Sequence, residues 1–333
     1  MNTWQHRIRL TCISVLLLSM VLRLTGSAAN LHPEKKENVA SFILYLQTGK
    51  HAHFSPAPTA APETAPEPET VPPPATEPPE KPLSFSQEDL DKLSVKYGGQ
   101  YRPELDTLLQ KPVLPDLTGQ APTVLILHTH ATESYTQAPG WEYEDLGNYR
   151  TLDENHNMLR VGAFLAELLR DAGICVLHDK TLHDYPSYNG SYNRSLATAK
   201  TYLEAYPSIQ MVIDVHRDAI EDGEGRQLST AFEVDGESSA RIMLVVGTDE
   251  GGLPHPGWQD NLSWALKLQA GMERLYPGLP RTLSLRKERF NQHITPCSLL
   301  VEVGTAGDTL EQALMAAEGF GETLVRLVKA GGG

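Results

Sequence analysis

The sequence predicts an α/β domain with a mixed, mostly parallel central sheet and helices on both faces. Short β-branched apolar runs alternate with amphipathic segments of helical length after about residue 120, as in sheets built from strand-helix-strand units. Several of these runs end in His, Asp or Glu, at the place where open α/β sheets collect their active-site side chains. One hairpin interrupts the alternation, and it is the reason to expect a mixed sheet.

The first 29 residues predict a secretory signal or a membrane anchor. Arg7 and Arg9 precede an apolar run at 10–22, and small residues at 26–29 would permit cleavage. The run is short for a bilayer span, which needs about 20 residues, so cleavage and retention both stay open. In either case the positive-inside bias keeps the two arginines in the cytoplasm, and we expect a membrane-anchored or exported, extracytoplasmic catalytic domain.

Three segments separate this signal or anchor, residues 1–29, from the catalytic domain. Residues 30–54 form a juxtamembrane segment whose single apolar patch is too short to span a membrane. Residues 55–83 are almost entirely Pro, Ala, Thr and Glu, which predicts a disordered, extended linker. Residues 84–118 are expected to form one amphipathic lead-in helix followed by a Pro-punctuated stretch. The catalytic domain is then expected at 119–330.

The first elements of that domain follow from periodicity. A β-branched run at 123–127 predicts a strand. Residues 155–172 repeat apolar side chains at helical spacing, and Gly173 follows at the position where glycine commonly ends a helix. A second apolar run at 174–177 predicts a strand, and 194–205 predicts the next helix.

The second half of the domain continues the alternation. A strand is expected at 210–215. A hairpin is expected to join 228–234 to 239–246, because Asp235-Gly236 is a favoured two-residue turn. By the same criteria the remaining elements are a helix at 261–275, strands at 282–286 and 298–303, and a helix at 309–328.

Charge and cysteine usage narrow the class of protein. The formal net charge of −14 argues against a nucleic-acid partner, which would require a basic face. The cysteines are Cys12, Cys175 and Cys297, and their spacing fits neither a Cys-rich zinc site nor a disulfide framework. We expect buried free thiols, with Cys175 and Cys297 the only pair that could form a bridge.

Imidazole and carboxylate groups at strand ends suggest a zinc hydrolase site. Zinc in such enzymes takes nitrogen ligands, often one carboxylate, and keeps one position open. His128, His130, Glu133 and His216 supply that set. His128 and His130 differ by two positions, so in an extended strand they point the same way and either could be the ligand. The polar run at 183–188 predicts packing rather than chemistry.

A carboxylate inside an apolar strand is the second chemical feature. Glu302 lies between two valines, and a buried carboxylate is costly unless it is paired or functional. Glu302 is therefore either the general base of hydrolysis or the partner of a salt bridge to Arg217 or Arg289. Arg217, Asn291 and Gln292 could bind an amide substrate or a developing oxyanion.

At these residues the chain resembles the stage II sporulation protein P family of spore-forming Firmicutes. The resemblance runs in order from about residue 120 to 330, and the anchor and spacer fit the family layout. The matching motifs are His-Thr-His-Ala-Thr-Glu-Ser-Tyr at 128–135, Val-Gly at 161–162, His-Asp-Tyr-Pro-Ser-Tyr-Asn-Gly-Ser-Tyr at 183–192, Asp-Val-His-Arg-Asp-Ala at 214–219, Phe-Asn-Gln-His at 290–293 and Val-Glu-Val-Gly at 301–304.

The resemblance implies an amidase-like scaffold, because the family is similar to zinc-dependent N-acetylmuramoyl-L-alanine amidases. It implies cleavage of the amide between muramic acid and L-alanine, and of peptide cross-links, in peptidoglycan during forespore engulfment, on the mother-cell side of the intermembrane space. Expected partners are the lytic transglycosylase sporulation protein D and a membrane anchor, sporulation protein M. The resemblance makes His216 a zinc ligand and Glu302 the catalytic base, with Asp153 or Glu154 as alternatives to Glu133.

Two other functions compete with this one. A wall-binding scaffold with a decayed metal site would need no intact ligand set, and a zinc carboxypeptidase would act on short stem peptides.

Overall fold

The computed structural model describes residues 84–112, 117, 119–234 and 236–331. The expected signal or anchor at 1–29, the juxtamembrane segment at 30–54 and the linker at 55–83 lie outside the described residues. Among the helices that are described, none combines the length and the apolar character needed to cross a bilayer.

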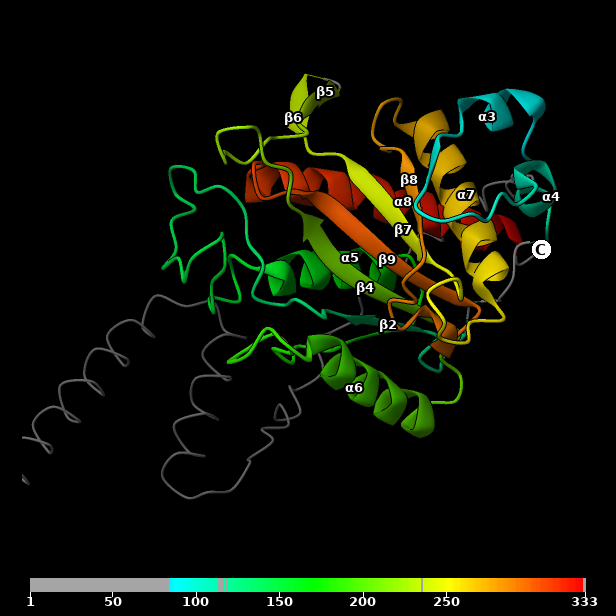
Figure 1. Ribbon diagram of the computed structural model, residues 1–333, viewed down its shortest axis with the longest axis horizontal. Helices are drawn as coiled ribbons and strands as arrows, with labels where there is room; N and C mark the ends of the chain where they lie inside the picture. The colour runs from blue at the N-terminus through cyan, green and yellow to red at the C-terminus, as the bar shows by residue number, and fades with distance from the viewer. Residues whose placement is uncertain (1–83, 113–116, 118, 235, 332–333) are drawn as a thin grey trace, which may run out of the picture. The chain divides into compact units, whose positions relative to one another are not determined.

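A seven-stranded sheet forms the centre of the described region, and every pair of neighbouring strands is parallel except β7 and β9. This confirms the expected mixed, mostly parallel sheet (Figure 1). In spatial order its strands are β1 (Val95–Tyr97), β8 (Leu283–Arg286), β7 (Ile242–Gly247), β9 (Cys297–Thr305), β4 (Met211–Asp218), β2 (Val124–Leu127) and β3 (Val176–His178).

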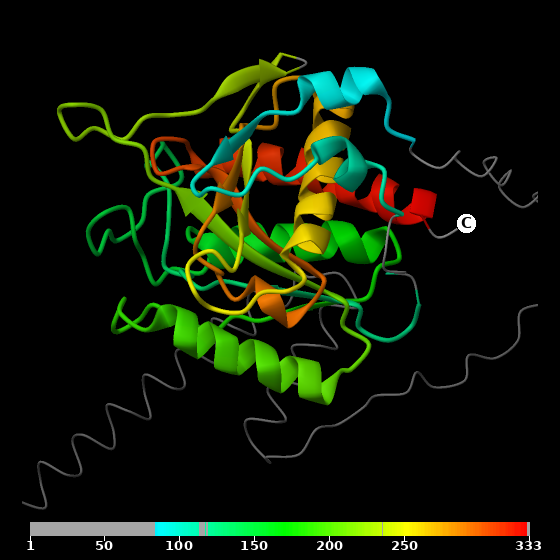
Figure 2. The same ribbon diagram turned by 45° about the vertical axis from the view of Figure 1, so that its right-hand side comes forward.

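Helices lie on both faces of the sheet, as expected. On one face α8 (Leu310–Gly331) packs against α5 (Met158–Asp171) and α7 (Trp258–Leu275). On the other face α6 (Ser191–Ala205) runs beside β2 (Figures 1 and 2). The helix α5 begins where Asn157 accepts a hydrogen bond from the backbone of Leu159.

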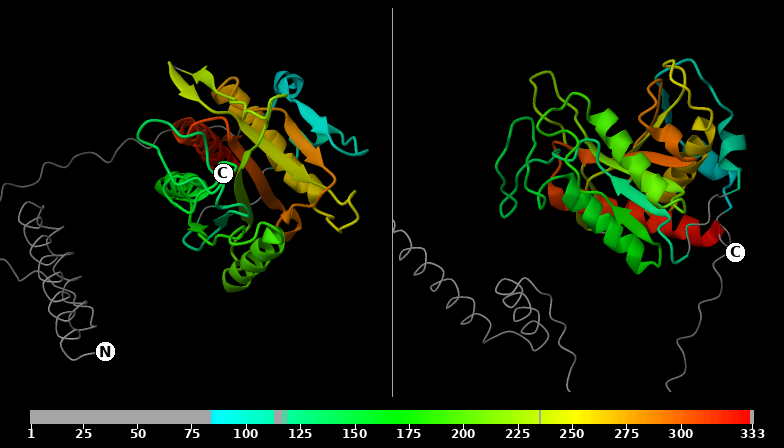
Figure 3. Two further views of the ribbon diagram at one scale, coloured as in Figure 1. Left: turned by 60° about the vertical axis from the view of Figure 1, so that its left-hand side comes forward. Right: turned by 90° about the horizontal axis from the view of Figure 1, so that it is seen from below.

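Two apolar clusters hold these layers together. The larger one fills the space between the sheet and the layer of α5, α7 and α8, and Figure 3 shows that layer from two further directions. The smaller one joins the sheet to α6 through Leu125, Leu127, Ala199, Ile209 and Val212. Successive strand residues therefore face opposite helix layers, and this alternation decides which polar side chains of β4 and β9 come together.

The structure differs from two expectations. Residues 84–118 do not form one helix: the helices α3 (Gln87–Lys92) and α4 (Leu105–Leu109) flank strand β1, whose Val95 pairs in parallel with Leu283. The expected long hairpin is reduced to β5 (Phe232–Val234) and β6 (Glu237–Ser239), because the following segment pairs with β9 in the main sheet instead.

The described cysteines meet the expectation in part. Neither Cys175 nor Cys297 forms a disulfide bond, and Cys297 is buried, whereas Cys175 is only partly buried. Burial raises the pKa of the Cys297 thiol well above the ordinary value, which suits an unreactive core residue.

Gly162 in α5 is required by the close approach of two histidines. A Cβ at this position would lie 2.4 Å from Nε2 of His128 and 2.7 Å from Nε2 of His178. Overpacking costs about 1–3 kcal/mol, which exceeds the helix-propensity gain of about 0.5–1 kcal/mol. We expect Gly162→Ala to lower the urea midpoint of unfolding. Gly223→Ala, where nothing lies within 4 Å, is the control, and equal midpoints for the two variants would contradict the packing argument.

Candidate active site

His216 on β4 and Glu302 on β9 occupy paired positions of neighbouring parallel strands. Paired residues project from the same face of a sheet, so the imidazole and the carboxylate lie side by side. The segment after β2 brings His130 and Glu133 to the same place, since β2 is the other neighbour of β4 (Figure 1). Three neighbouring strands of the sheet, β9, β4 and β2, thus supply the site, as the pattern of polar residues at strand ends predicts.

His130 and Glu133 both approach His216. The rings of His130 and His216 meet edge to face with centroids 5.2 Å apart. Oε2 of Glu133 lies 3.6 Å from Nδ1 of His216. All three side chains are buried, so burial lowers the pKa of His130 to about 4 and favours its neutral, metal-binding form.

Glu133 is held as a carboxylate by its surroundings. Burial by itself would raise its pKa, but the hydrogen bond to His216 and the charge of Arg217 lower the pKa to about 2. Arg150 adds an ion pair, with Nη2 3.1 Å from Oε1. A carboxylate that stays ionised at neutral pH is a suitable ligand for a cation.

Asp214 is a functional residue that the sequence reasoning missed. Its Oδ1 lies 2.9 Å from Nε2 of His216, although the pair lacks the geometry of a hydrogen bond. The backbone N–H and hydroxyl of Thr129 donate to Asp214 at 2.8 and 2.6 Å. Burial lowers the pKa of His216, but Asp214 and Glu133 outweigh it and raise that pKa well above the ordinary value.

The position of Asp214 could have been found from the sequence. Asp214, His216 and Asp218 alternate along one apolar strand, which is the pattern of a polar face. A carboxylate behind a histidine fixes the orientation of the ring, which is its usual role beside metal ligands.

His130, Glu133 and His216 are the residues that could hold a metal ion. The chemistry of this donor set fits zinc: two imidazoles and a carboxylate. Nδ1 of His130 is buried and without a hydrogen-bond partner, and His216 turns Nδ1 toward Glu133 while Asp214 lies beside its Nε2. In the described part of the chain, no three His, Cys, Asp or Glu side chains already enclose a metal position. Binding would therefore require the three side chains to draw closer together.

His128 differs from the expectation that it points with His130. Its Nδ1 lies 3.0 Å from the carbonyl oxygen of Val215, and its Nε2 lies 2.9 Å from Nε2 of His178. Both ring nitrogens are engaged and the side chain is fully buried. The reason is that β2 ends at Leu127, so the strict alternation of a strand does not extend to His130. His130 is the better placed of the two.

The alternative carboxylates Asp153 and Glu154 have local partners on the surface. Asp153 lies 2.8 Å from Nδ1 of His156, and Glu154 lies 3.3 Å from Nζ of Lys180. Neither has a contact with His130 or His216 among the described interactions. Glu133 therefore remains the carboxylate of the candidate site.

Glu302 has no salt bridge among the described residues. Its Oε2 is shielded from solvent and has no hydrogen-bond partner. Burial raises its pKa to about 8, although the charge of nearby His216 acts in the opposite direction. Arg217 and Arg289, the two expected partners, bond elsewhere. A partly protonated carboxyl beside a metal-binding set has the properties of a general acid and base.

Arg217 differs from its expected role in substrate binding. The side chain is buried, and its guanidinium donates to the carbonyl oxygens of Ser134, Asn148 and Tyr149 at 2.8, 3.1 and 3.1 Å. These bonds fix the loop that follows Glu133, and Nη1 lies 3.9 Å from that carboxylate. Arg217 is thus a positioning residue for the site.

This role predicts a large effect on stability. Arg217→Met removes the donor from the carbonyl oxygens of Ser134 and Asn148, whereas that of Tyr149 still accepts from the backbone N–H of Ser134. A buried unpaired group costs about 1–3 kcal/mol, so we expect a loss of about 2 kcal/mol in the free energy of unfolding. Urea titration measures it. Arg226→Met, which removes an arginine whose side chain is 72% exposed, should change little; a small effect of Arg217→Met would contradict the positioning role.

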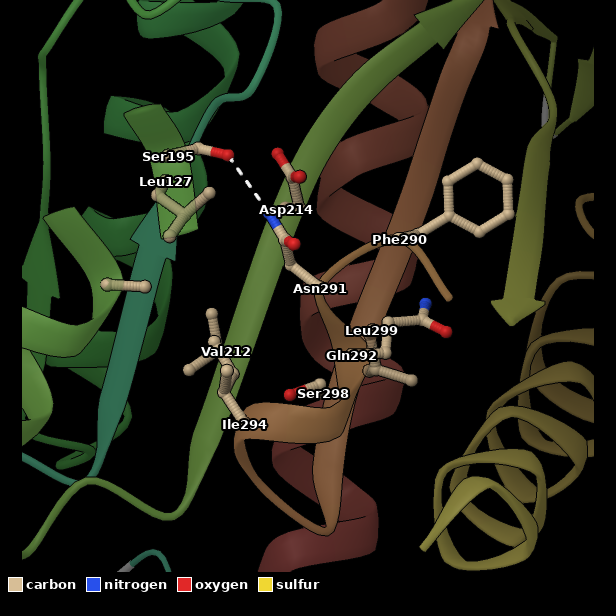
Figure 4. A pocket seen from close by; sticks show the side chains of 11 residues that line it. Leu127, Ser195, Val212, Asp214, Phe290, Asn291, Gln292, Ile294, Ser298 and Leu299 are labelled. Atoms are coloured by element: carbon tan, nitrogen blue, oxygen red, sulfur yellow. Dashed lines mark hydrogen bonds between the residues drawn. The ribbon is translucent and has the colours of Figure 1, made fainter. Parts of the chain in front are cut away.

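Asn291 and Gln292 also differ from expectation, because the protein uses their amides itself. Asn291 donates to the carbonyl oxygen of Tyr192 at 2.7 Å and to Ser195 at 3.3 Å (Figure 4). Gln292, which starts the short helix η1 (Gln292–Ile294), bonds to Val245 and Gly247 of β7 at 2.7 and 2.6 Å. The cavity they line has a volume of about 10 Å³, room for no more than about one water molecule.

Tyr188 is the second contributor that sequence reasoning missed. Its ring stacks on His130 with centroids 4.6 Å apart and an interplanar angle of 13°. The residue is 56% exposed, and the guanidinium of Arg150 also lies over its ring, with Cζ 5.1 Å from the centroid. Asp184 in the same run accepts hydrogen bonds from Thr132 and Arg150, which ties the run to the segment after β2.

Comparison with known proteins places this site in a family. Residues 49–325 match the family described as stage II sporulation protein P. The stage II sporulation protein P of Bacillus subtilis (strain 168) is 30% identical over 222 residues, which are 62% of this chain and 51% of that protein. The chain therefore spans about half the length of this curated relative.

Solved structures of low sequence identity were also found. The CwlD amidase of Clostridioides difficile, in complex with the GerS lipoprotein, is 15% identical and covers 63% of this chain and 95% of that one, with a TM-score of 0.38. The N-acetylmuramyl-L-alanine amidase Ami1 of Mycobacterium smegmatis is 12% identical over 64% and 97%, also with a TM-score of 0.38. On the family match, this chain belongs to the stage II sporulation protein P family.

Proposed function

We propose that this chain is a zinc-dependent peptidoglycan hydrolase that cleaves the amide between N-acetylmuramic acid and L-alanine. The observation that carries the proposal is the grouping of His130, Glu133 and His216 beside the unpartnered carboxyl of Glu302. Membership of a sporulation family supports peptidoglycan as the substrate. The bond that is cleaved, and a further endopeptidase activity on cross-links, rest on the family resemblance.

The residues of the site divide the reaction between them. His130, Glu133 and His216 would hold zinc, which supplies Lewis-acid polarisation and lowers the pKa of a water molecule. Glu302 accepts a proton from the attacking water at Oε2 as the carbon–oxygen bond forms. It then delivers that proton to the amide nitrogen as the carbon–nitrogen bond breaks, which releases a neutral amine. Asp214 holds the His216 ring in place.

The setting of the reaction belongs to the same proposal. On the resemblance, the domain acts outside the cytoplasm from a membrane anchor, during forespore engulfment. The transglycosylase sporulation protein D and the membrane protein M are the proposed partners.

Product analysis tests the bond specificity. Purified protein is incubated with sacculi, and released fragments are examined by mass spectrometry and N-terminal labelling. We expect stem peptides with a free N-terminal L-alanine. Stems shortened only from the carboxyl end would instead indicate a carboxypeptidase. Binding to sacculi without release of any fragment would indicate a scaffold.

A further inference from the structure

A groove lined by basic side chains lies beside the candidate active site. Its volume is about 670 Å³, and its lining residues come from β1, β8, β7 and the end of β4, from the helices α3 and α7, and from the segments next to these elements. We call it the basic groove, because its lining includes five basic side chains and two acidic ones. The basic ones are Lys92, Lys96, Arg241, Arg281 and Arg286.

The basic groove adjoins the candidate active site across strands β7 and β9, although none of His130, Glu133, His216 and Glu302 lines it. Met243, which lines the groove, is the paired residue of Glu302 across β7 and β9. Neighbouring strands lie about 5 Å apart, and paired residues share a face of the sheet. The groove therefore begins one strand away from the Glu302 carboxyl, and Asp218, two residues beyond His216, lines its other side.

Two of the five basic side chains of the groove have no ion-pair partner among the described residues. Lys92 pairs with Glu88 at 2.9 Å and Arg286 with Glu288 at 3.4 Å. Lys96 and Arg241 form no ion pair with any residue that the structure describes, although Arg241 packs over the ring of Phe232. Arg281 pairs with Asp218 through Nη2 at 2.9 Å, while its Nη1 has no hydrogen-bond partner. The positive charge left for a ligand is therefore mainly that of Lys96 and Arg241, in a chain whose net charge is −14.

We propose that the basic groove binds the free carboxylates of a peptidoglycan stem peptide and so places the bond to be cleaved beside Glu302. The inference rests on the proposed function and names the part of the substrate that the groove recognises. Stem peptides carry side-chain and terminal carboxylates, which are complementary to this cluster of Lys and Arg. A groove across several strands also suits an extended peptide, at about 3.3 Å per residue.

Binding to the Glu302→Gln protein, full chain, tests this proposal without hydrolysis. The probes are a synthetic stem peptide with free carboxylates, the same peptide with every carboxylate amidated, and an oligomer of glycerol phosphate. We expect the free acid to bind about tenfold more tightly than the amide, because two exposed ion pairs of up to about 1 kcal/mol each are lost. Added salt should reduce the difference.

Two double variants test whether the free carboxylates bind in the basic groove. Lys96→Gln with Arg241→Gln, which keeps the aliphatic stems, should weaken binding of the free acid by about tenfold. Lys200→Gln with Arg226→Gln removes two positive charges elsewhere and should leave the dissociation constant unchanged. Thermal unfolding of both double variants confirms that they are folded.

Three other outcomes would overturn the proposal. Equal binding of free and amidated peptide would remove the role of charge, and equal weakening by both double variants would remove the role of this groove. Tighter binding of glycerol phosphate than of peptide would assign the groove to a phosphate polymer. If the wild-type chain binds the peptide but cleaves no amide, the proposed function is refuted, while the proposed binding of peptide in the groove is not.

Discussion

Glu302→Gln is expected to lower the rate of peptidoglycan hydrolysis by about 10²–10⁴-fold while zinc stays bound. The amide has the shape of the carboxyl group but cannot accept the proton of the attacking water or return it to the leaving nitrogen. Release of soluble fragments from sacculi measures the rate, and metal analysis of the same preparation measures zinc. Loss of zinc from this variant would contradict its assignment as base and make it a ligand.

In metal-free protein, the Glu302→Gln variant should also change how the free energy of unfolding depends on pH. Burial raises the pKa of Glu302 from 4.5 to about 8, so between these values the folded protein holds a proton that the unfolded chain has released. Wild-type stability should therefore fall as the pH rises through this window, and Glu302→Gln should lack that fall. Urea unfolding at pH 5 and pH 8 measures the difference, and parallel behaviour of the two proteins would show that Glu302 is ionised throughout.

His216→Ala is expected to abolish both zinc binding and hydrolysis. Removal of a carboxylate behind a metal-binding histidine typically costs 10–100-fold in metal affinity, and removal of the histidine itself should cost more. The zinc affinity of Asp214→Asn should therefore lie between that of His216→Ala and that of the wild type. Zinc titration with a competing chelator measures all three proteins.

Two control variants test whether the zinc ligands are the proposed ones or include Asp153. His156→Ala and Asp153→Asn alter a surface pair and should leave zinc affinity unchanged. His130→Ala should behave like His216→Ala. Retention of zinc by His130→Ala, or its loss from Asp153→Asn, would show that the ligand set has been assigned wrongly.

Much of the fold could be predicted from the sequence, because it depends on local periodicity. Val124–Leu127, Met211–Asp218 and Cys297–Thr305 are built around apolar and β-branched residues, so each sequence predicts a buried strand. Local periodicity does not predict the strand in the lead-in segment at 84–118. Val95–Tyr97 is a strand only because β8 offers it an edge, and that partner lies nearly 190 residues further along the chain.

The site could be predicted only in part, for a related reason. The strand positions of His216 and Glu302 follow from alternation, so their proximity could be foreseen. The sequence does not reveal which polar side chains bond to the protein's own backbone and are therefore not available for a substrate. The protein uses the side chains of Arg217, Asn291 and Gln292 to bond backbone groups of a loop, of α6 and of β7 respectively. Those contacts depend on how distant segments pack.

The central claim is that His130, Glu133 and His216 hold a zinc ion that hydrolysis requires. The most direct measurement follows fragment release from sacculi by one preparation of the full chain, first after removal of metal by a chelator and then after addition of one equivalent of zinc. The account predicts loss of activity and its recovery with zinc in the wild type, and no recovery in His216→Ala. Undiminished hydrolysis by the chelated protein would contradict it.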